Sequence, residues 1–113
     1  MVYHIDEVIS NIIYIERKKI MESNKLKTKK FMKEIADAIS KGTGIKNSFS
    51  RNDYGTLVYD FNIGCTYMTN NGGNSLYMAI LDEYGNCYKE IISADVRQFI
   101  NQAIYFLNKC NLG

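Results

Sequence analysis

Residues 57 to 67 read LVYDFNIGCTY, and this stretch decides the fold. Its odd-numbered positions are large or apolar, whereas its even-numbered positions are mostly polar or small. Successive side chains of a strand point to opposite faces, so this alternation is typical of a strand with one buried face. We therefore predict a strand at about 56–68, in an antiparallel sheet that helices cover on one side.

Residues with turn chemistry lie on both sides of this strand. Glycine and asparagine adopt the positive φ angles of tight turns, and they recur in 52–55 (NDYG), 70–74 (NNGGN) and 83–86 (EYGN). Between these turns we expect strands at about 45–50, 75–82 and 87–92. The result is a β meander of three or four strands, depending on whether 45–50 forms a strand.

Apolar residues at helical spacing precede the strand region. They recur first at Ile5, Val8, Ile9, Ile12 and Ile13, and then at Phe31, Ile35, Ala38 and Ile39. We predict helices at about 5–22 and 26–41, with Gly42 as the residue that follows the second helix. One long helix over 5–41 is the alternative, but the apolar phase shifts near Ser23 and Asn24, which favours two.

A third helical pattern follows the strands, at about 94–109. Its apolar residues are Val96, Phe99, Ile100, Ala103, Ile104 and Leu107. We expect Ser93 to cap this helix and Asp95 to lie in its first turn. The fold class is therefore α+β: N-terminal helices, the meander, and a C-terminal helix packed on one face of the sheet.

Size and composition favour one domain over residues 1–113. The chain is 46% hydrophobic, which is ordinary for a protein with a single core. It has no apolar stretch of membrane-spanning length, and its start lacks the order of a signal peptide, so we expect a soluble cytoplasmic protein with no membrane contact. The three cysteines lie far apart, which predicts reduced, partly buried thiols.

Groups for catalysis are scarce. The chain has a single histidine, His4, near a terminus, and no pair of cysteines at metal-binding spacing. A dyad of His4 with a cysteine is the remaining enzymatic alternative, and no local signature accompanies it. We expect a protein that is not an enzyme and that needs no metal or cofactor.

The basic residues are concentrated in one segment, 16–33. The segment contains eight lysine and arginine residues and two glutamates, which gives it a net charge of +6 in a chain whose total net charge is +2. Such a segment can contact nucleic acid or a ribonucleoprotein, can bind an acidic protein, or can be a solvated helix face. Only one of the eight is arginine, which counts against sequence-specific readout.

Two further features could contact a partner. The asparagine- and glycine-rich loop at 70–74 could insert into a partner from the tip of a hairpin. Tyr77 and Tyr88 could point outward from the sheet, whereas Tyr59 and Tyr67 share the face of Phe61 and are expected in the core. The predicted partner-binding residues are Lys25, Lys27, Lys29, Lys30, Asn70, Asn71, Asn74, Tyr77 and Tyr88.

The C-terminal half supports a resemblance to a class of small proteins. The turn 82–86 (DEYGN), the strand to Ile92 and the helix from Ser93 to Asn108, together with the lysine-, asparagine- and isoleucine-rich composition, resemble small phage or mobile-element inhibitors of bacterial defence, including anti-CRISPR proteins. The resemblance implies a stoichiometric inhibitor of a defence nuclease or ribonucleoprotein, acting in the host cytoplasm. The net charge of +2 departs from the acidity usual in that class and counts against simple DNA mimicry.

Two other expectations remain open at this point. The alternative function is a small basic regulator that binds nucleic acid. The consecutive residues Ile12-Ile13-Tyr14-Ile15 give the first predicted helix a wider apolar surface than packing on one sheet face requires. This suggests a homodimer.

Overall fold

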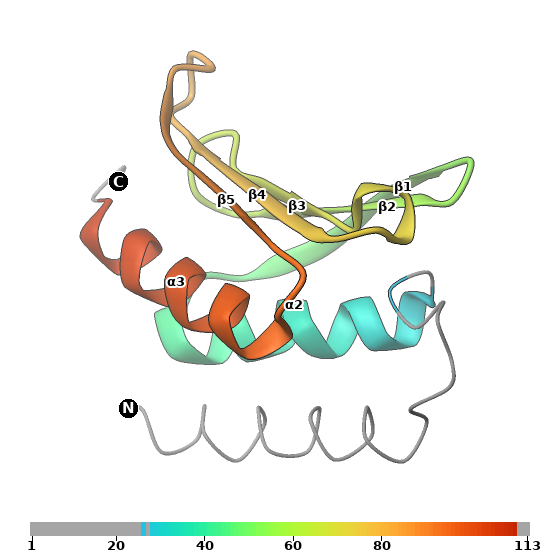
Figure 1. Cartoon of the computed structure of the whole chain (residues 1–113). Coiled ribbons are helices and arrows are strands. Elements are labelled where there is room, and N and C mark those ends of the chain that lie inside the picture. Colours follow the sequence, from blue (N-terminus) through green and yellow to red (C-terminus); the bar gives the residue numbers. More distant parts are fainter. Residues whose placement is uncertain (1–25, 27, 111–113) are drawn as a thin grey trace.

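Within the described residues, a five-stranded sheet forms one layer and two α-helices form a second (Figure 1). The computed structural model describes residue 26 and residues 28–110, so the helix expected at 5–22 and the run 12–15 lie outside the described residues. The elements in chain order are α2 (Lys29–Thr43), β1 (Asn47–Asp53), β2 (Thr56–Phe61), β3 (Tyr67–Thr69), the short 3-10 helix η2 (Asn71–Gly73), β4 (Leu76–Leu81), β5 (Cys87–Ser93) and α3 (Val96–Lys109).

The sheet is an antiparallel meander, in which each strand pairs with the next along the chain. This confirms the α+β class and the antiparallel sheet, but the sheet has one strand more than we expected. The strand predicted at 56–68 is two strands, because the chain turns between Phe61 and Tyr67. The Phe61 amide donates a hydrogen bond to the Thr66 carbonyl at 3.0 Å, and Gly64 adopts a φ of 57°. Alternation in the sequence continues through this turn and therefore conceals it.

Helix α2 begins at a capped residue. Thr28 is extended, and its side chain accepts a hydrogen bond from the Phe31 amide at 3.3 Å. An extended residue interrupts a helix, so residues 5–41 do not form one continuous helix. The C-terminal end is also later than predicted: Gly44, not Gly42, has the left-handed conformation (φ 76°), and its amide donates to the Ser40 carbonyl.

The N-cap of helix α3 likewise lies two residues beyond the predicted cap. Asp95 is the N-cap, and its carboxylate accepts a hydrogen bond from the Gln98 amide at 3.0 Å. Ser93 ends β5, and its hydroxyl accepts from the Asp95 amide. Aspartate thus takes the capping role because serine is already engaged in the turn that leads into the helix.

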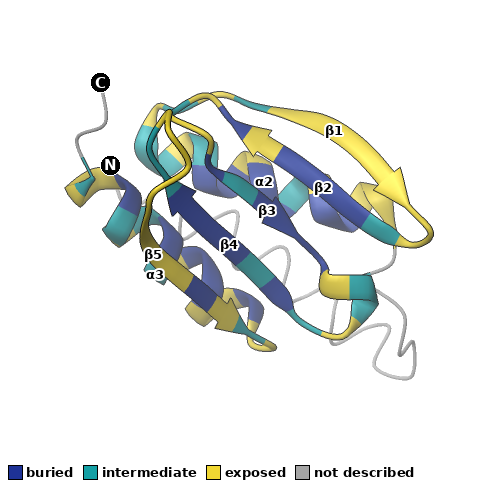
Figure 2. Cartoon of the chain, turned by 90° about the horizontal axis from the view of Figure 1, so that it is seen from above, coloured by how far each residue is buried: buried dark blue, intermediate teal, exposed yellow. Residues whose placement is uncertain are grey.

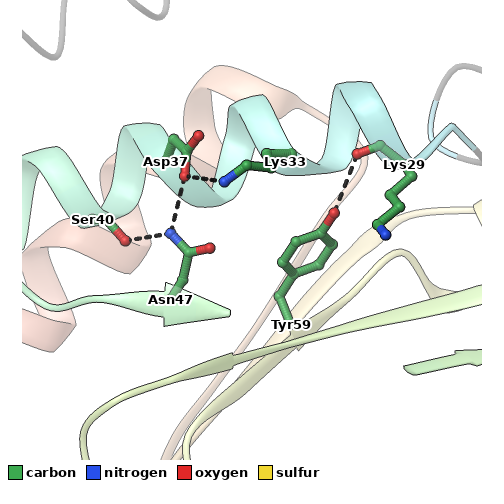
Figure 3. A network of polar contacts seen from close by, with 6 residues as sticks. All are labelled: Lys29, Lys33, Asp37, Ser40, Asn47 and Tyr59. Atoms are coloured by element: carbon green, nitrogen blue, oxygen red, sulfur yellow. Dashed lines mark hydrogen bonds and ion pairs between the residues drawn. The ribbon is translucent and has the colours of Figure 1, made fainter. Parts of the chain in front are cut away.

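The core lies between the sheet and the helices. Its largest fully buried side chains are Tyr59, Phe99, Met32, Ile35, Ile39, Met68, Leu76, Met78, Ile80 and Ile91. As predicted, Tyr59 belongs to the core, and its hydroxyl donates a hydrogen bond to the Lys29 carbonyl at 3.2 Å (Figure 3). Full burial of such side chains stabilises the fold by about 1.5 to 3 kcal/mol each.

Polar contacts join β1 to α2 (Figure 3). The Asn47 amide group donates to the Ser40 hydroxyl at 2.6 Å and to the Asp37 carboxylate at 3.2 Å. Asp37 also pairs with Lys33, one turn earlier in the helix, at 3.2 Å. These contacts hold the first strand, whose other residues are exposed, against the helical layer.

Candidate functional site

One face of the sheet is covered by neither α2 nor α3, and the short η2 borders it at one end. Both helices pack on the opposite face, because Tyr59 of β2 reaches the start of α2 and the Lys89 ammonium lies 4.4 Å from the Phe106 ring centroid of α3. Since side chains alternate along a strand, the neighbours of these residues point to the other side. Figure 2 looks onto that side and shows buried central strands between two exposed edges.

Strand pairing places ten residues on this uncovered side in two rows. The first row is Arg51, Val58, Thr69, Tyr77 and Ile92, from β1 to β5. The second row is Ser48, Asp60, Tyr67, Ala79 and Glu90. We call these ten residues the open face.

A pair of tyrosines occupies the centre of the open face. The rings of Tyr67 and Tyr77 have centroids 6.1 Å apart, in a tilted arrangement. On the same side of the sheet, Val58 and Ala79 are only 4% and 3% exposed, although neither belongs to the core cluster between the layers. This side of the sheet therefore contains a second, smaller group of buried apolar residues.

A short hydrogen bond fixes one of the two rings. The Tyr77 hydroxyl donates to a Glu90 carboxylate oxygen at 2.6 Å. This bond, with a smaller contribution from burial, raises the pKa of Tyr77 well above its ordinary value, so the phenol stays neutral. Next to the pair, Ile92 is 64% exposed, which extends the apolar surface toward β5.

Charge is unevenly divided between the two layers. The strands and their turns carry Lys46, Arg51 and Lys89 against Asp53, Asp60, Asp82, Glu83 and Glu90, a net charge of −2. The two helices with their caps carry Lys29, Lys30, Lys33, Lys41, Arg97 and Lys109 against Glu34, Asp37 and Asp95, a net charge of +3. The open face itself includes two of the carboxylates, and its one cation, Arg51, is paired with Asp53 at 2.7 Å.

Asn70 is not exposed at the tip of the loop, as the prediction of a contact there had assumed. It is fully buried, and its side chain joins three segments: its oxygen accepts from the Leu57 amide at 2.8 Å, and its nitrogen donates to the Leu26 and Gly55 carbonyls at 2.6 and 3.1 Å. The asparagine amide can imitate a peptide group, which explains this role. Turn chemistry in the sequence does not distinguish such a structural asparagine from an exposed one.

The other predicted loop and lysine residues gather at one end of the molecule. Asn71 and Asn74 are exposed beside η2, and the bond from Asn70 to Leu26 brings that turn close to the start of α2. Lys30 is exposed there, while the Lys29 ammonium lies 3.9 Å from the Phe49 ring centroid. Lys25 and Lys27 lie outside the described residues. This end adjoins the open face at Thr69, whose hydroxyl accepts a hydrogen bond from the Asn71 amide at 2.8 Å.

The two predicted tyrosines do not form one site. Tyr77 is on the open face, but Tyr88 is held at the β4–β5 turn, where its hydroxyl donates to Asp82 at 3.4 Å. Tyr67, expected in the core, is half-buried on the open face instead, because the turn at 62–66 places it opposite Asp60 and not in line with Tyr59. The sequence also gave no sign of Asp60, Glu90 and Ile92 as neighbours of this pair.

The described residues also include three cysteines and line an open cleft. Cys65 and Cys87 are exposed and only Cys110 is partly buried, so the prediction of partly buried thiols is wrong for two of the three. An open cleft of about 710 Å³ lies beside the 62–66 turn, with Lys46, Asp60 and Cys65 in its wall. No group of three or more histidine, cysteine, aspartate or glutamate residues in the described part of the chain could hold a metal ion.

Comparison of the chain with protein-family models, curated proteins and solved structures found no match. Neither α2 nor α3, the two α-helices of the described residues, has the length and hydrophobicity needed to cross a membrane. The open face, with its tyrosine pair, is therefore the candidate site that the geometry itself supplies.

Proposed function

We propose that the protein acts by binding a protein or ribonucleoprotein partner through the open face, without chemistry. The observation that carries this proposal is the tyrosine pair on a sheet face that neither α2 nor α3 covers. Tyrosine offers a large contact area at a low cost in conformational entropy, and exposed apolar surface such as Ile92 marks contact sites when it adjoins aromatic rings.

The edges of the sheet are less suited to binding than its face. Edge strands can recruit a partner strand, and β1 and β5 are both edges. Each edge pair contains a register irregularity, between Phe49 and Arg51 and between Ile80 and Leu81, and each edge carries charged residues. Bulges and charges are the devices that discourage strand addition.

The partner class that we propose is a bacterial defence nuclease or ribonucleoprotein, so that the protein is a stoichiometric, anti-CRISPR-like inhibitor in the host cytoplasm. Support for this part comes from the composition and from the resemblance of the turn 82–86 and the segments after it. A small domain with one binding face suits an inhibitor that occupies its target without modifying it.

Reconstitution with purified defence effector complexes tests the proposal. The protein should comigrate with an effector on size exclusion, abolish its target binding or cleavage, and leave the mass of both components unchanged. The double variant Tyr67→Ser/Ile92→Asn should no longer comigrate. Tyr105→Ser is the matched control, because Tyr105 is 55% exposed on α3, in the opposite layer. Failure to comigrate with any effector would overturn the proposal.

A second candidate function is nonspecific nucleic-acid binding through the helical layer. The net charge of +3 on α2 and α3, which continues the basic segment 16–33, favours it. Replacement of Lys25, Lys27, Lys29 and Lys30 by glutamine should then abolish a salt-sensitive gel shift that persists with a scrambled DNA sequence. A protein that acts through the open face would keep its effector binding in that variant.

A further inference from the structure

Carboxylates lie at both ends of the tyrosine pair. Asp60 is directly opposite Tyr67 on the neighbouring strand, and Glu90 accepts the hydrogen bond of Tyr77. The exposed Asp60 side chain makes no hydrogen bond or ion pair with another described residue. Neither carboxylate is paired with a lysine or arginine from residues 28–110. The order across the sheet is thus acid, ring, ring, acid.

This order matches the chemistry of arginine. A guanidinium is planar, stacks on aromatic faces, and can bond a carboxylate through two N–H groups at once. Phosphates and acidic peptides would instead meet Asp60 and Glu90 as like charges. We propose that the open face binds a protein segment that presents two arginine side chains, one to Asp60 beside Tyr67 and the other to Glu90 beside Tyr77. The inference rests on the proposed function and adds the chemistry of the partner.

The spacing of the two acids defines the segment more closely. Asp60 and Glu90 stand in the same row, on β2 and β5, which are three strand spacings or about 14 Å apart. An extended segment advances about 3.3 Å per residue and directs alternate side chains to the same side. Arginines at positions i and i+4 are therefore about 13 Å apart and point the same way. A segment that crosses the strands with this spacing reaches both acids.

Labelled peptides with a serine- and threonine-rich background test this geometry. The first peptide has arginine at i and i+4, the second has the two arginines adjacent, the third replaces both by lysine, and the fourth by glutamate. Fluorescence anisotropy should give the tightest binding for the first, and amide shifts in NMR spectra should map to the open face. Asp60→Asn and Glu90→Gln should each weaken its binding about 1.5- to fivefold, the range of exposed ion pairs.

Glu34→Gln on α2 is the matched control, since it removes one carboxylate from the helical layer and should leave peptide affinity unchanged. Glu90→Gln keeps an oxygen that can accept from Tyr77, so the fold should persist.

Equal binding of the four peptides, or shifts confined to α2 and α3, would overturn the inference. Effector binding that depends on Tyr67 and Ile92 without any preference for arginine would overturn only the inference. Arginine-dependent peptide binding without any effector partner would overturn only the proposed function.

Discussion

The side-chain amide of Asn70 donates a hydrogen bond of 2.6 Å to the carbonyl of Leu26, a residue 44 positions earlier in the chain. The same side chain bonds the turn and the second strand of the first hairpin, at Gly55 and Leu57. One buried asparagine therefore fixes the approach to α2, the β1–β2 turn and the start of η2 relative to one another.

Replacement of Asn70 by alanine should destabilise the protein strongly. The Leu57 amide and two carbonyls would lose their partner in a buried place, and an unsatisfied buried group costs about 1 to 3 kcal/mol. We expect the free energy of unfolding in urea to fall by about 3 kcal/mol. Asn74→Ala, at an exposed position of the same loop, should change it by less than about 0.5 kcal/mol. Equal effects of the two substitutions would contradict the structural role of Asn70.

The left-handed glycine that ends α2 provides a second prediction. A Cβ atom at Gly44 would meet nothing within 4 Å, so the cost of Gly44→Ala is conformational and not steric. A left-handed conformation costs an L-residue about 1 to 2 kcal/mol, and the stability should fall by that amount in chemical denaturation. Gly44→Asn should cost less, because asparagine tolerates this conformation. If Gly44→Ala leaves the stability unchanged, the helix ends at another residue.

Local patterns predicted the layers of this molecule better than they predicted its details. The alternation in 57–67 correctly indicated an antiparallel sheet with one covered face, because burial on one side imposes a period of two. It placed Tyr67 on the wrong face, because a turn inside the stretch preserves the alternation while it reverses the chain. Asn70 was misassigned for a different reason: its partners at Leu26, Gly55 and Leu57 lie at distances along the chain that no local pattern reports. The open face could not be predicted from the sequence for the same reason, because its residues are identified only by the register of five strands.

The cysteines should differ in their reactivity toward a thiol reagent. Cys65 and Cys87 are exposed, whereas Cys110, which follows α3, is partly buried against the core. Since the reagent must reach the thiolate, two thiols should be modified in the native protein and the third more slowly. Single cysteine-to-serine variants would identify each, and full denaturant should equalise the three rates. Native protection of Cys65 or Cys87 would show that its surface is covered in solution.

The hydrogen bond between Tyr77 and Glu90 should make stability depend on alkaline pH. The folded state raises the pKa of Tyr77 above its ordinary value of 10.0, chiefly through this bond, so folding favours the neutral phenol. The contribution is therefore fully present below pH 10.0 and is lost as the pH rises further, toward the pKa of the folded state. The free energy of unfolding should fall over that range, and Tyr77→Phe should remove part of the decline. In Glu90→Gln a neutral amide oxygen replaces the carboxylate as the acceptor, so the shift should become smaller, and tyrosinate absorbance should show one tyrosine ionising at lower pH than in the parent protein. If Tyr77→Phe instead removes a tyrosine that titrates at the ordinary value, the Tyr77 hydroxyl is not bonded to Glu90 in solution. The Glu90 carboxylate would then lie elsewhere than the proposed arginine site on the open face requires.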